Sequence, residues 1–415
     1  MPPMLPSLLA RTWNPGTTSA EFFNQWHNPA DVFSVLLILG GDVVARALAQ
    51  LSGSRVTPVA FSFGWVAYSV SAVVSVFGAN KLMPAPDCPC MVINGQTGYV
   101  RDNHSWIIGR MVRDYGSWMH DDTRHQLERI IVERWNKEKR RKSPGDPDPP
   151  RPTQTGLCVS IYNSERVLPG HPGRDAIYYF GLMTGVVQLG IAAIPCGIHG
   201  NWGIMVITAV GILLSLVMGS LGQWKQEKWA CRSGKQNSVI LTKGNGSQHA
   251  IVVFGEARGL DLEALAISPA ITDTLTTTVT RVVVILLTLL WVFLLIAASA
   301  LKQDTWYLLA VGGIGMLQNI LAAGVSRTPE QFGISLSFQT VICRPKVMET
   351  LLEVEAKYHG VGRSMLGVLF PGKLRPQEEE LWNEIAVRAA AAMEKPKLSN
   401  DLGAGHETSQ EVKGS

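Results

Sequence analysis

An acid and a base stand one helical turn apart inside an apolar stretch near the N-terminus. The stretch "LLILGGDVVARALAQL" carries Asp42 and Arg46, and residues four apart share one face of a helix. Charged side chains inside a membrane are costly and mark substrate or proton pathways in many membrane proteins. The pair therefore indicates such a pathway, or else an ion pair that fixes helix packing or lies at the membrane interface.

Amide side chains in two other apolar stretches extend this hypothesis. Gln188 lies in one stretch, and Gln318 and Asn319 are adjacent in another. Such groups either line a polar cavity or form hydrogen bonds between helices, and we favour the second role for these three. Together with Asp42 and Arg46 they form the candidate intramembrane polar path.

A basic cluster predicts a second kind of site. It follows Trp135 at the end of a predicted amphipathic helix, and its members are Lys137, Lys139, Arg140, Arg141 and Lys142. Lysine and arginine bind anionic lipid headgroups, while a neighbouring tryptophan inserts among the acyl chains. We predict a contact with the lipid surface here, with a solvated charge run that merely ends a helix as the alternative.

The sequence offers no signature of catalysis, metal binding or cofactor binding. Cys88 and Cys90 with His104, His120 and His125 match no standard zinc spacing. The turn in "GNGSQHAIVV" lacks the phosphate-binding glycine patterns, so a hairpin turn explains it. No paired nucleophile and base can be named. A net charge of +4 is too small to argue for nucleic acid, and no nucleic-acid-reading motif accompanies it, so we expect no nucleic-acid partner.

The composition indicates an integral membrane protein. Hydrophobic residues make up 46% of the chain and charged residues 17%, against roughly 25% charged in soluble domains. Six apolar stretches are near the 20 residues that cross a bilayer, and they are 31–51, 57–79, 176–198, 202–221, 282–301 and 305–324. The first is the weakest, because two central charges cost roughly 2.5–3.5 kcal/mol each and nearly cancel the gain from its apolar residues.

Basic residues near the ends of the stretches predict the orientation. The turn 199–201 carries no lysine or arginine, whereas Lys225, Lys228, Arg281 and Arg327 lie beside the long segments. Because lysine and arginine favour cytoplasmic loops, we expect the long segments and both termini to lie in the cytosol. The six spans then form three hairpins.

The long segments contain patterned elements of their own. Helical spacing predicts helices over 103–118, 124–137 and 345–358, and alternation or short apolar runs predict strands at 157–162, 238–242, 250–254 and 333–342. Because an isolated hairpin is marginal in water, we expect the strands to join one small cytosolic α+β unit. Spacing supports no disulfide among the six cysteines, most of which lie in segments where thiols stay reduced.

The predicted fold is therefore mainly α: a polytopic helical membrane protein with a small cytosolic α+β unit. Its parts are the N-terminal cytosolic segment 1–30, the first hairpin 31–79, a cytosolic loop with amphipathic helices and a proline-rich linker 80–175, the second hairpin 176–221, a loop with a β-hairpin 222–281, the third hairpin 282–324, cytosolic strand and helices 325–394, and a disordered tail 395–415.

Several segments look familiar as a set, among them "NPADVFSVLLILGGDVVARALAQL", "GIAAIPCGIHGNWGI", "GNGSQHAIVV" and "VGRSM…FPGKLR". They resemble a family of uncharacterised multi-pass membrane proteins of filamentous fungi, and the likeness runs over most of the chain. The resemblance implies a membrane location and a fungal source, and it carries no catalytic residue with it.

Two functions fit these observations. The first is a membrane-anchored scaffold or regulatory protein whose cytosolic unit binds protein partners. The second is a transporter or channel that moves a small polar solute or ion past Asp42 and Arg46. The sizeable, patterned cytosolic part favours the first, because few intramembrane charges make a sparse transport path.

Overall fold

The chain folds into two compact units. The computed structural model describes residues 30–141, 147–165, 173–231, 237–255, 259–268 and 274–388. The helical unit comprises Met1–Pro84, Arg174–Gln226 and Ala270–Val325, and the sheet unit comprises Ala85–Gly173, Glu227–Pro269 and Ser326–Ser415. The protein is mainly helical with one small sheet, as predicted. The predicted tail 395–415 and nearly all of segment 1–30 lie outside the described residues.

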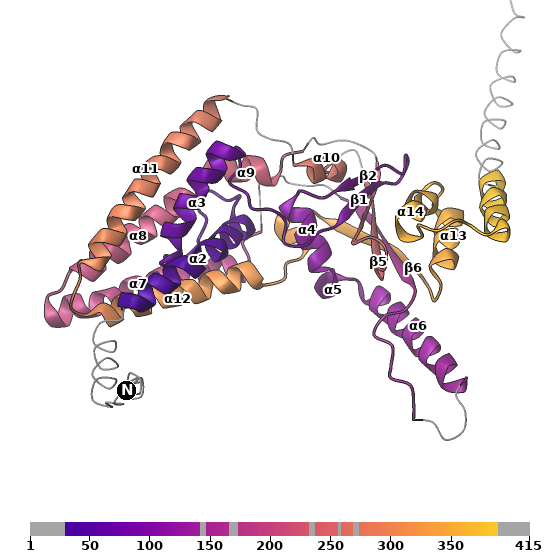
Figure 1. The fold of residues 1–415 in the computed structure, drawn as a ribbon, viewed down its shortest axis with the longest axis horizontal. Coiled ribbons are helices and arrows are strands. Elements are labelled where there is room, and N and C mark those ends of the chain that lie inside the picture. Colours follow the sequence, from indigo (N-terminus) through magenta and orange to yellow (C-terminus); the bar gives the residue numbers. More distant parts are fainter. Residues whose placement is uncertain are drawn as a thin grey trace, which may run out of the picture. The chain divides into compact units, whose positions relative to one another are not determined.

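Six apolar helices build the helical unit (Figure 1). They are α2 (Ala30–Leu51), α3 (Gly64–Gly78), α7 (Ala176–His199), α8 (Gly203–Gly219), α11 (Thr274–Ser299) and α12 (Thr305–Gly324). Among the described residues, α7, α11 and α12 are long and apolar enough to cross a membrane. A fourth such span exists if α8 and the short α9 (Gly222–Lys228), which meet at a 42° bend, are one unit.

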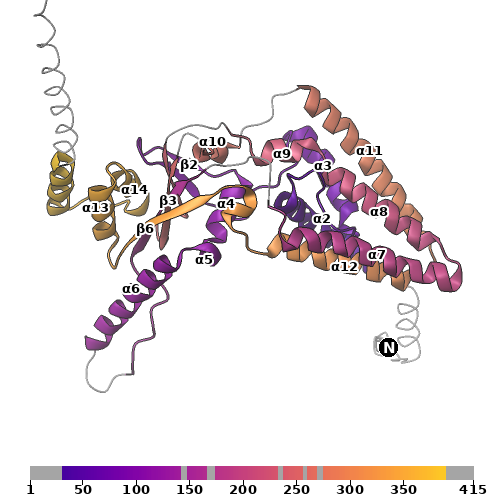
Figure 2. The same cartoon turned by 180° about the vertical axis from the view of Figure 1, so that it is seen from behind.

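The six helices contact one another in a cyclic order. Neighbouring pairs are α2 with α12, α12 with α7, α7 with α8, α8 with α11, α11 with α3, and α3 with α2 (Figures 1 and 2). Large apolar side chains such as Met183, Leu213 and Phe293 point outward from this ring. Outward apolar side chains are what a lipid environment requires.

The prediction that residues 57–79 form one transmembrane helix is wrong. Residues 57–62 are not helical, and α3 begins only at Gly64. Thr57 contacts Gly219 at the end of α8, whereas Gly64 packs against Gly40 in the middle of α2. This non-helical segment, 57–63, therefore runs into the interior of the ring.

Helix α3 then leads back to the end of the ring from which the segment entered. Its first turn places Trp65 against Trp291 in the middle of α11, with the two rings stacked at 5.5 Å. Beyond its last turn, Asn80 reaches Thr277 near the beginning of α11. Residues 57–79 thus enter and leave at one end, and they do not cross the unit.

The sheet unit is built on six strands in the order β2-β1-β4-β5-β3-β6. They are β1 (Met91–Asn94), β2 (Val100–Asp102), β3 (Leu157–Ser164), β4 (Ser238–Thr242), β5 (His249–Gly255) and β6 (Leu336–Arg344). Strands β3 and β5 are parallel, and the other pairs are antiparallel. All four predicted strands belong to this sheet, whereas the short β1 and β2 were not predicted.

Helices cover both faces of the sheet, because side chains alternate along each strand. Leu241 and Ile251 pack on one face with α4 (Trp106–Arg113), α5 (Tyr115–Trp118), α10 (Leu262–Ile267) and the 3-10 helix η1 (Pro329–Phe332). Ile240 and Val252 pack on the other face with α13 (Val347–Lys357) and α14 (Val361–Leu369). Helix α6 (Asp121–Arg140) packs Ile130 beside β3, and a further helix covers residues 376–388.

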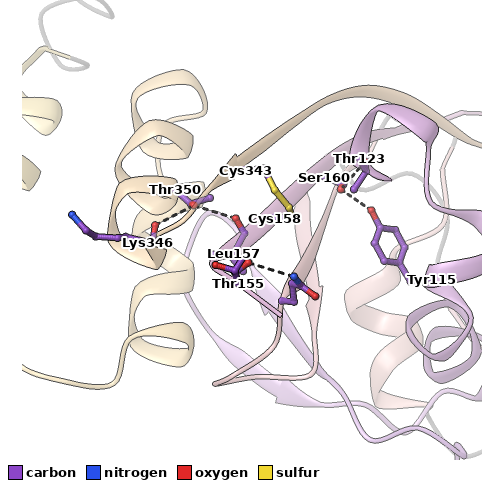
Figure 3. The surroundings of a disulfide bond; sticks show 10 residues. Tyr115, Thr123, Thr155, Leu157, Cys158, Ser160, Cys343, Lys346 and Thr350 are labelled. Carbon is purple, nitrogen blue, oxygen red and sulfur yellow. Dashed lines mark hydrogen bonds between the residues drawn. A yellow bond between two sulfur atoms is a disulfide. The ribbon is translucent and has the colours of Figure 1, made fainter. Parts of the chain in front are cut away.

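The prediction that no disulfide forms is also wrong. Cys158 on β3 and Cys343 on β6 are paired residues of neighbouring antiparallel strands and form a disulfide (Figure 3). They are 185 residues apart in the sequence. Spacing could not reveal this pair, because the sheet, and not the local sequence, brings the two cysteines together.

Candidate functional site

The charged pair of the predicted polar path lies apart from the amide groups. Arg46 Nε is 2.9 Å from Asp42 Oδ2, and the two side chains are 45% and 69% exposed. Gln188, Gln318 and Asn319 are buried inside the helical unit. The structure therefore brings the three amides together but leaves the ion pair on the outer surface of α2.

The amides bind the backbone of the non-helical segment. Gln188 Nε2 on α7 donates to the carbonyl oxygens of Phe61, at 2.7 Å, and of Val311, at 2.8 Å. The backbone N–H of Ala60 donates to Gln318 Oε1 at 3.2 Å and to Asn319 Oδ1 at 3.1 Å. Two helices of the ring thus supply partners for peptide groups that a helix would have paired internally.

Further bonds complete this network. Asn319 Nδ2 donates to the Ala60 carbonyl at 3.1 Å and to Ser62 Oγ at 3.2 Å, and Trp65 Nε1 donates to the same carbonyl at 2.8 Å. Thr57 Oγ1 donates to the Gly219 carbonyl at 2.8 Å. Non-helical backbone is tolerated at membrane depth only where protein or a water-filled cavity satisfies its polar groups. These side chains meet that condition for the N–H and carbonyl of Ala60 and for the Phe61 carbonyl.

Glycines let the helices approach the segment closely. A Cβ at Gly315 would lie 1.8 Å from the Phe61 carbonyl oxygen, and one at Gly181 would lie 2.1 Å from the Pro58 carbonyl oxygen. Both distances are far inside van der Waals contact. These glycines of α12 and α7 therefore make room for segment 57–63.

A pocket of about 370 Å³ lies in the sheet unit, beside the turn that joins β4 to β5. Its floor comes from the sheet face that packs on α4 and α5. The lining residues combine an apolar wall with polar and basic groups, and they are Val112, Arg113, Tyr115, Gly116, Gln154, Leu241, Lys243, Asn245, Gly246, Ser247, Gln248, His249 and Ile251.

The charges at the pocket are basic. None of the described lining residues is an aspartate or a glutamate. Arg113 also binds Asp87 and Asp114, at 2.7 Å each, so much of its charge is compensated. Lys243 is exposed and has no ion pair in the described part of the chain. Lys243 therefore supplies most of the positive charge.

His249 forms part of the wall as a neutral ring. Burial, with a smaller contribution from the Lys243 ammonium, lowers the pKa of His249 to about 4. The Tyr115 ring meets it edge-on at 5.2 Å, and the Tyr115 hydroxyl donates to Ser160 Oγ at 2.6 Å. Burial raises the pKa of Tyr115, so this hydroxyl stays protonated at neutral pH.

This pocket was not predicted from the sequence. The "GNGSQH" stretch reads as a hairpin turn, and it is one: Gly244 and Gly246 have positive φ values of 94° and 81°. The available signal was a lysine before the glycines and a histidine after them. The second wall comes from α4 and α5, more than 120 residues earlier in the sequence, which no local pattern reveals.

The predicted lipid-contact cluster has partners within the sheet unit. Trp135 Nε1 donates to the Pro149 carbonyl at 2.9 Å, and Lys139 Nζ lies 3.7 Å from the centre of the Trp135 ring. Lys139 also pairs with Asp148 at 3.2 Å. Lys142 lies outside the described residues. The contact of this cluster with lipid stays a prediction.

The cysteines weighed as metal ligands are buried thiols. Burial raises the pKa of Cys90 to about 12 and also raises that of Cys88, whereas a metal binds the thiolate. Within the described ranges no three His, Cys, Asp or Glu side chains converge in a way that could hold an ion.

Comparison with known proteins adds no assignment to these sites. No protein-family model, curated protein or solved structure matches the chain.

Proposed function

We propose that this chain is a polytopic membrane protein that acts as a membrane-anchored scaffold or regulatory protein, and that its sheet unit binds a partner at the pocket beside the β4–β5 turn. The observation that carries the proposal is the pocket itself. It combines an apolar wall with a few convergent polar groups, which is the usual constitution of a binding site.

The way the chain builds the sheet supports the anchoring. Strands β3, β5 and β6 come from three chain segments that α7–α8 and α11–α12 separate, yet they are hydrogen-bonded neighbours. Strands of one sheet must lie on one side of a membrane, so each helix pair crosses an even number of times. His199 Nδ1 lies 2.9 Å from Asp304 Oδ1, which links the two short turns of these hairpins.

The course of residues 57–79 changes the proposed topology. If α2 crosses once and 57–79 returns to the side it entered from, the protein has five spans and not six. The N-terminus then lies on the side opposite the sheet unit. The basic residues beside the long segments favour a sheet unit in the cytosol, whereas the Cys158–Cys343 disulfide favours an oxidising compartment.

A reporter on the N-terminus tests this topology. We expect protease or a membrane-impermeant label to reach an N-terminal tag from the non-cytosolic side, and a tag after residue 388 from the cytosolic side. Accessibility of both tags from the cytosol would restore six spans.

A pair of glycine substitutions tests partner binding at the pocket. Gly116 lines the pocket, and a Cβ there meets no atom closer than 3.9 Å, so Gly116→Leu places a large side chain in the pocket without a clash at the Cβ. Gly367→Leu is the matched control, because Gly367 is an exposed glycine of α14 with open space beside it. We expect some proteins that cross-link to the wild type in cells to be absent from the cross-linked products of Gly116→Leu and present in those of Gly367→Leu. Identical neighbours in both variants would count against the proposal.

Transport of a small polar solute or ion is the second candidate function. The observation that favours it is segment 57–63, since transporters and channels place non-helical backbone inside a bundle at the substrate path. The path would then follow this segment rather than Asp42 and Arg46. Proteoliposomes that conduct K⁺ and H⁺ no faster than empty vesicles would refute transport of those ions. If Asp42→Asn retains a measured flux, the ion pair is not part of the path.

A further inference from the structure

We propose that the pocket beside the β4–β5 turn binds the phosphate group of a small phosphate ester. This inference rests on the proposed function, because it names the ligand class for the same pocket. The phosphate would lie against Lys243 and the turn, and the organic part would lie against the wall formed by Tyr115, His249 and Ile251.

The charge of the pocket selects an anion. Lys243 is its uncompensated cation, the Arg113 guanidinium at its rim is paired with Asp87 and Asp114, and the described lining holds no carboxylate. A lysine ammonium is a common phosphate ligand because it is a compact point charge. A cationic ligand, by contrast, would find no carboxylate partner among the described lining residues.

The β4–β5 turn supplies donors for the anion. The Gly244 N–H donates to Thr242 Oγ1, and the Ser247 N–H donates to the Gly244 carbonyl. The N–H groups of Asn245 and Gly246, between them, donate to no group in the part of the chain that the structure describes. Consecutive backbone N–H groups in a turn with left-handed residues form a concave anion site.

The rest of the pocket fits an organic group. Tyr115, His249, Leu241 and Ile251 give one side an aromatic and aliphatic character, and Gln154 offers an amide. The low pKa of His249 keeps its ring uncharged at neutral pH, so the ring can pack against an apolar or aromatic moiety. A volume of about 370 Å³ lies within the range of small-molecule sites.

Phosphate of this kind comes from two sources, a soluble phosphorylated metabolite or the phosphorylated headgroup of a lipid. The experiment therefore uses the purified full-length protein with four probes. Inorganic phosphate and adenosine monophosphate are titrated in detergent. Nanodiscs are prepared with and without phosphatidylinositol 4-phosphate, and sulfate at equal ionic strength serves as the reference anion.

Two matched variants test the site. Lys243→Gln removes the proposed ammonium contact, and Lys373→Gln removes an equal charge from an exposed loop of the same unit. Loss of a hydrogen bond to a charged group predicts that Lys243→Gln weakens phosphate-probe binding about ten-fold or more. Lys373→Gln is expected to bind like the wild type.

The outcomes separate this inference from the function on which it rests. The inference is supported if a phosphate probe binds saturably, if Lys243→Gln weakens this binding and if Lys373→Gln does not. Binding of a soluble probe then indicates a phosphorylated metabolite, and binding only to nanodiscs with the phosphorylated lipid indicates a lipid headgroup. Binding no tighter than that of sulfate, or equal in both lysine variants, overturns it. If Gly116→Leu still loses cellular neighbours in that case, partner binding at the pocket survives with another ligand class.

Discussion

Replacing Gln188 with methionine tests whether the amides hold segment 57–63 in place. Methionine keeps the length of the side chain but removes the donor that binds the carbonyl oxygens of Phe61 and Val311. Val311 lies within α12 and keeps its helical bond. The Phe61 oxygen, by contrast, loses its partner among the described residues.

The expected change in the free energy of unfolding combines the loss of a hydrogen bond with a smaller gain from removing an unpaired oxygen. Leaving a buried acceptor unsatisfied costs about 1–3 kcal/mol, while hydrogen bonds inside helical membrane proteins average about 0.6 kcal/mol and reach about 1.7 kcal/mol. Methionine also removes Gln188 Oε1, a buried atom without a partner among the described residues, which returns part of the loss. We expect Gln188→Met to lower the free energy of unfolding by about 1–2 kcal/mol.

The assay is equilibrium unfolding of the full chain in mixed micelles with increasing SDS, followed by far-UV circular dichroism. Gln303→Met is the control, because Gln303 is exposed in the short turn between α11 and α12. It should stay within about 0.5 kcal/mol of the wild type, as surface substitutions usually do. A Gln188→Met variant as stable as Gln303→Met would refute the view that this amide supports the segment.

Three further outcomes follow from the geometry. A Cβ at Gly315 would lie 1.8 Å from a buried carbonyl oxygen, whereas a Cβ at Gly313 would lie in open space. Gly315→Ala should therefore lower the free energy of unfolding by about 1–3 kcal/mol, and Gly313→Ala should leave it unchanged. The same SDS titration measures both variants. In the folded protein the pKa of His249 is about 4, below its usual 6.5. The unfolded chain therefore takes up the proton first as the pH drops, so the free energy of unfolding should fall between about pH 6.5 and about pH 4. At about 1.36 kcal/mol per pH unit the loss is up to about 3 kcal/mol. Urea unfolding at several pH values should show this slope in the wild type and a flatter one in His249→Gln. Alkylation of the oxidised, denatured protein should label four cysteines before reduction and six after it; Cys158→Ser should label five either way, and six labels in the unreduced wild type would contradict the pairing with Cys343.

The elements with regular periodicity could be predicted from the sequence. The ends of α7, α8 and α12 lie within two residues of the predicted stretches, and β4 coincides with the predicted strand. Helix α11 begins eight residues before its stretch, because threonines continue the helix where hydropathy falls. Local pattern sufficed here, since each of these elements is a continuous apolar run bounded by polar or turn-forming residues.

What the sequence could not supply depends on contacts between distant residues. Residues 57–63 are as apolar as a lipid-facing helix, so hydropathy cannot show that the segment is buried and paired with side chains. Gln188 and Asn319 were expected to form hydrogen bonds between helices, whereas the structure pairs both of them with the non-helical segment, and only Gln188 also reaches a second helix, at the Val311 carbonyl. Asp42 and Arg46 were expected near them, yet both side chains are exposed on α2, and it is the following turn of α2 that buries Ala49 and Gln50.

The sheet draws its strands from three stretches of chain, and this has a consequence for biosynthesis. Strand β3 has no neighbour until β5 and β6 have been synthesised, and β6 follows the last helix pair. If one helix of either later pair failed to insert, the next strand would emerge on the wrong side of the bilayer and could not join. In the topology proposed above, closure of the sheet would therefore depend on correct membrane insertion, because only a correctly inserted chain could cover the edge of β3, and an uncovered strand edge is prone to aggregation.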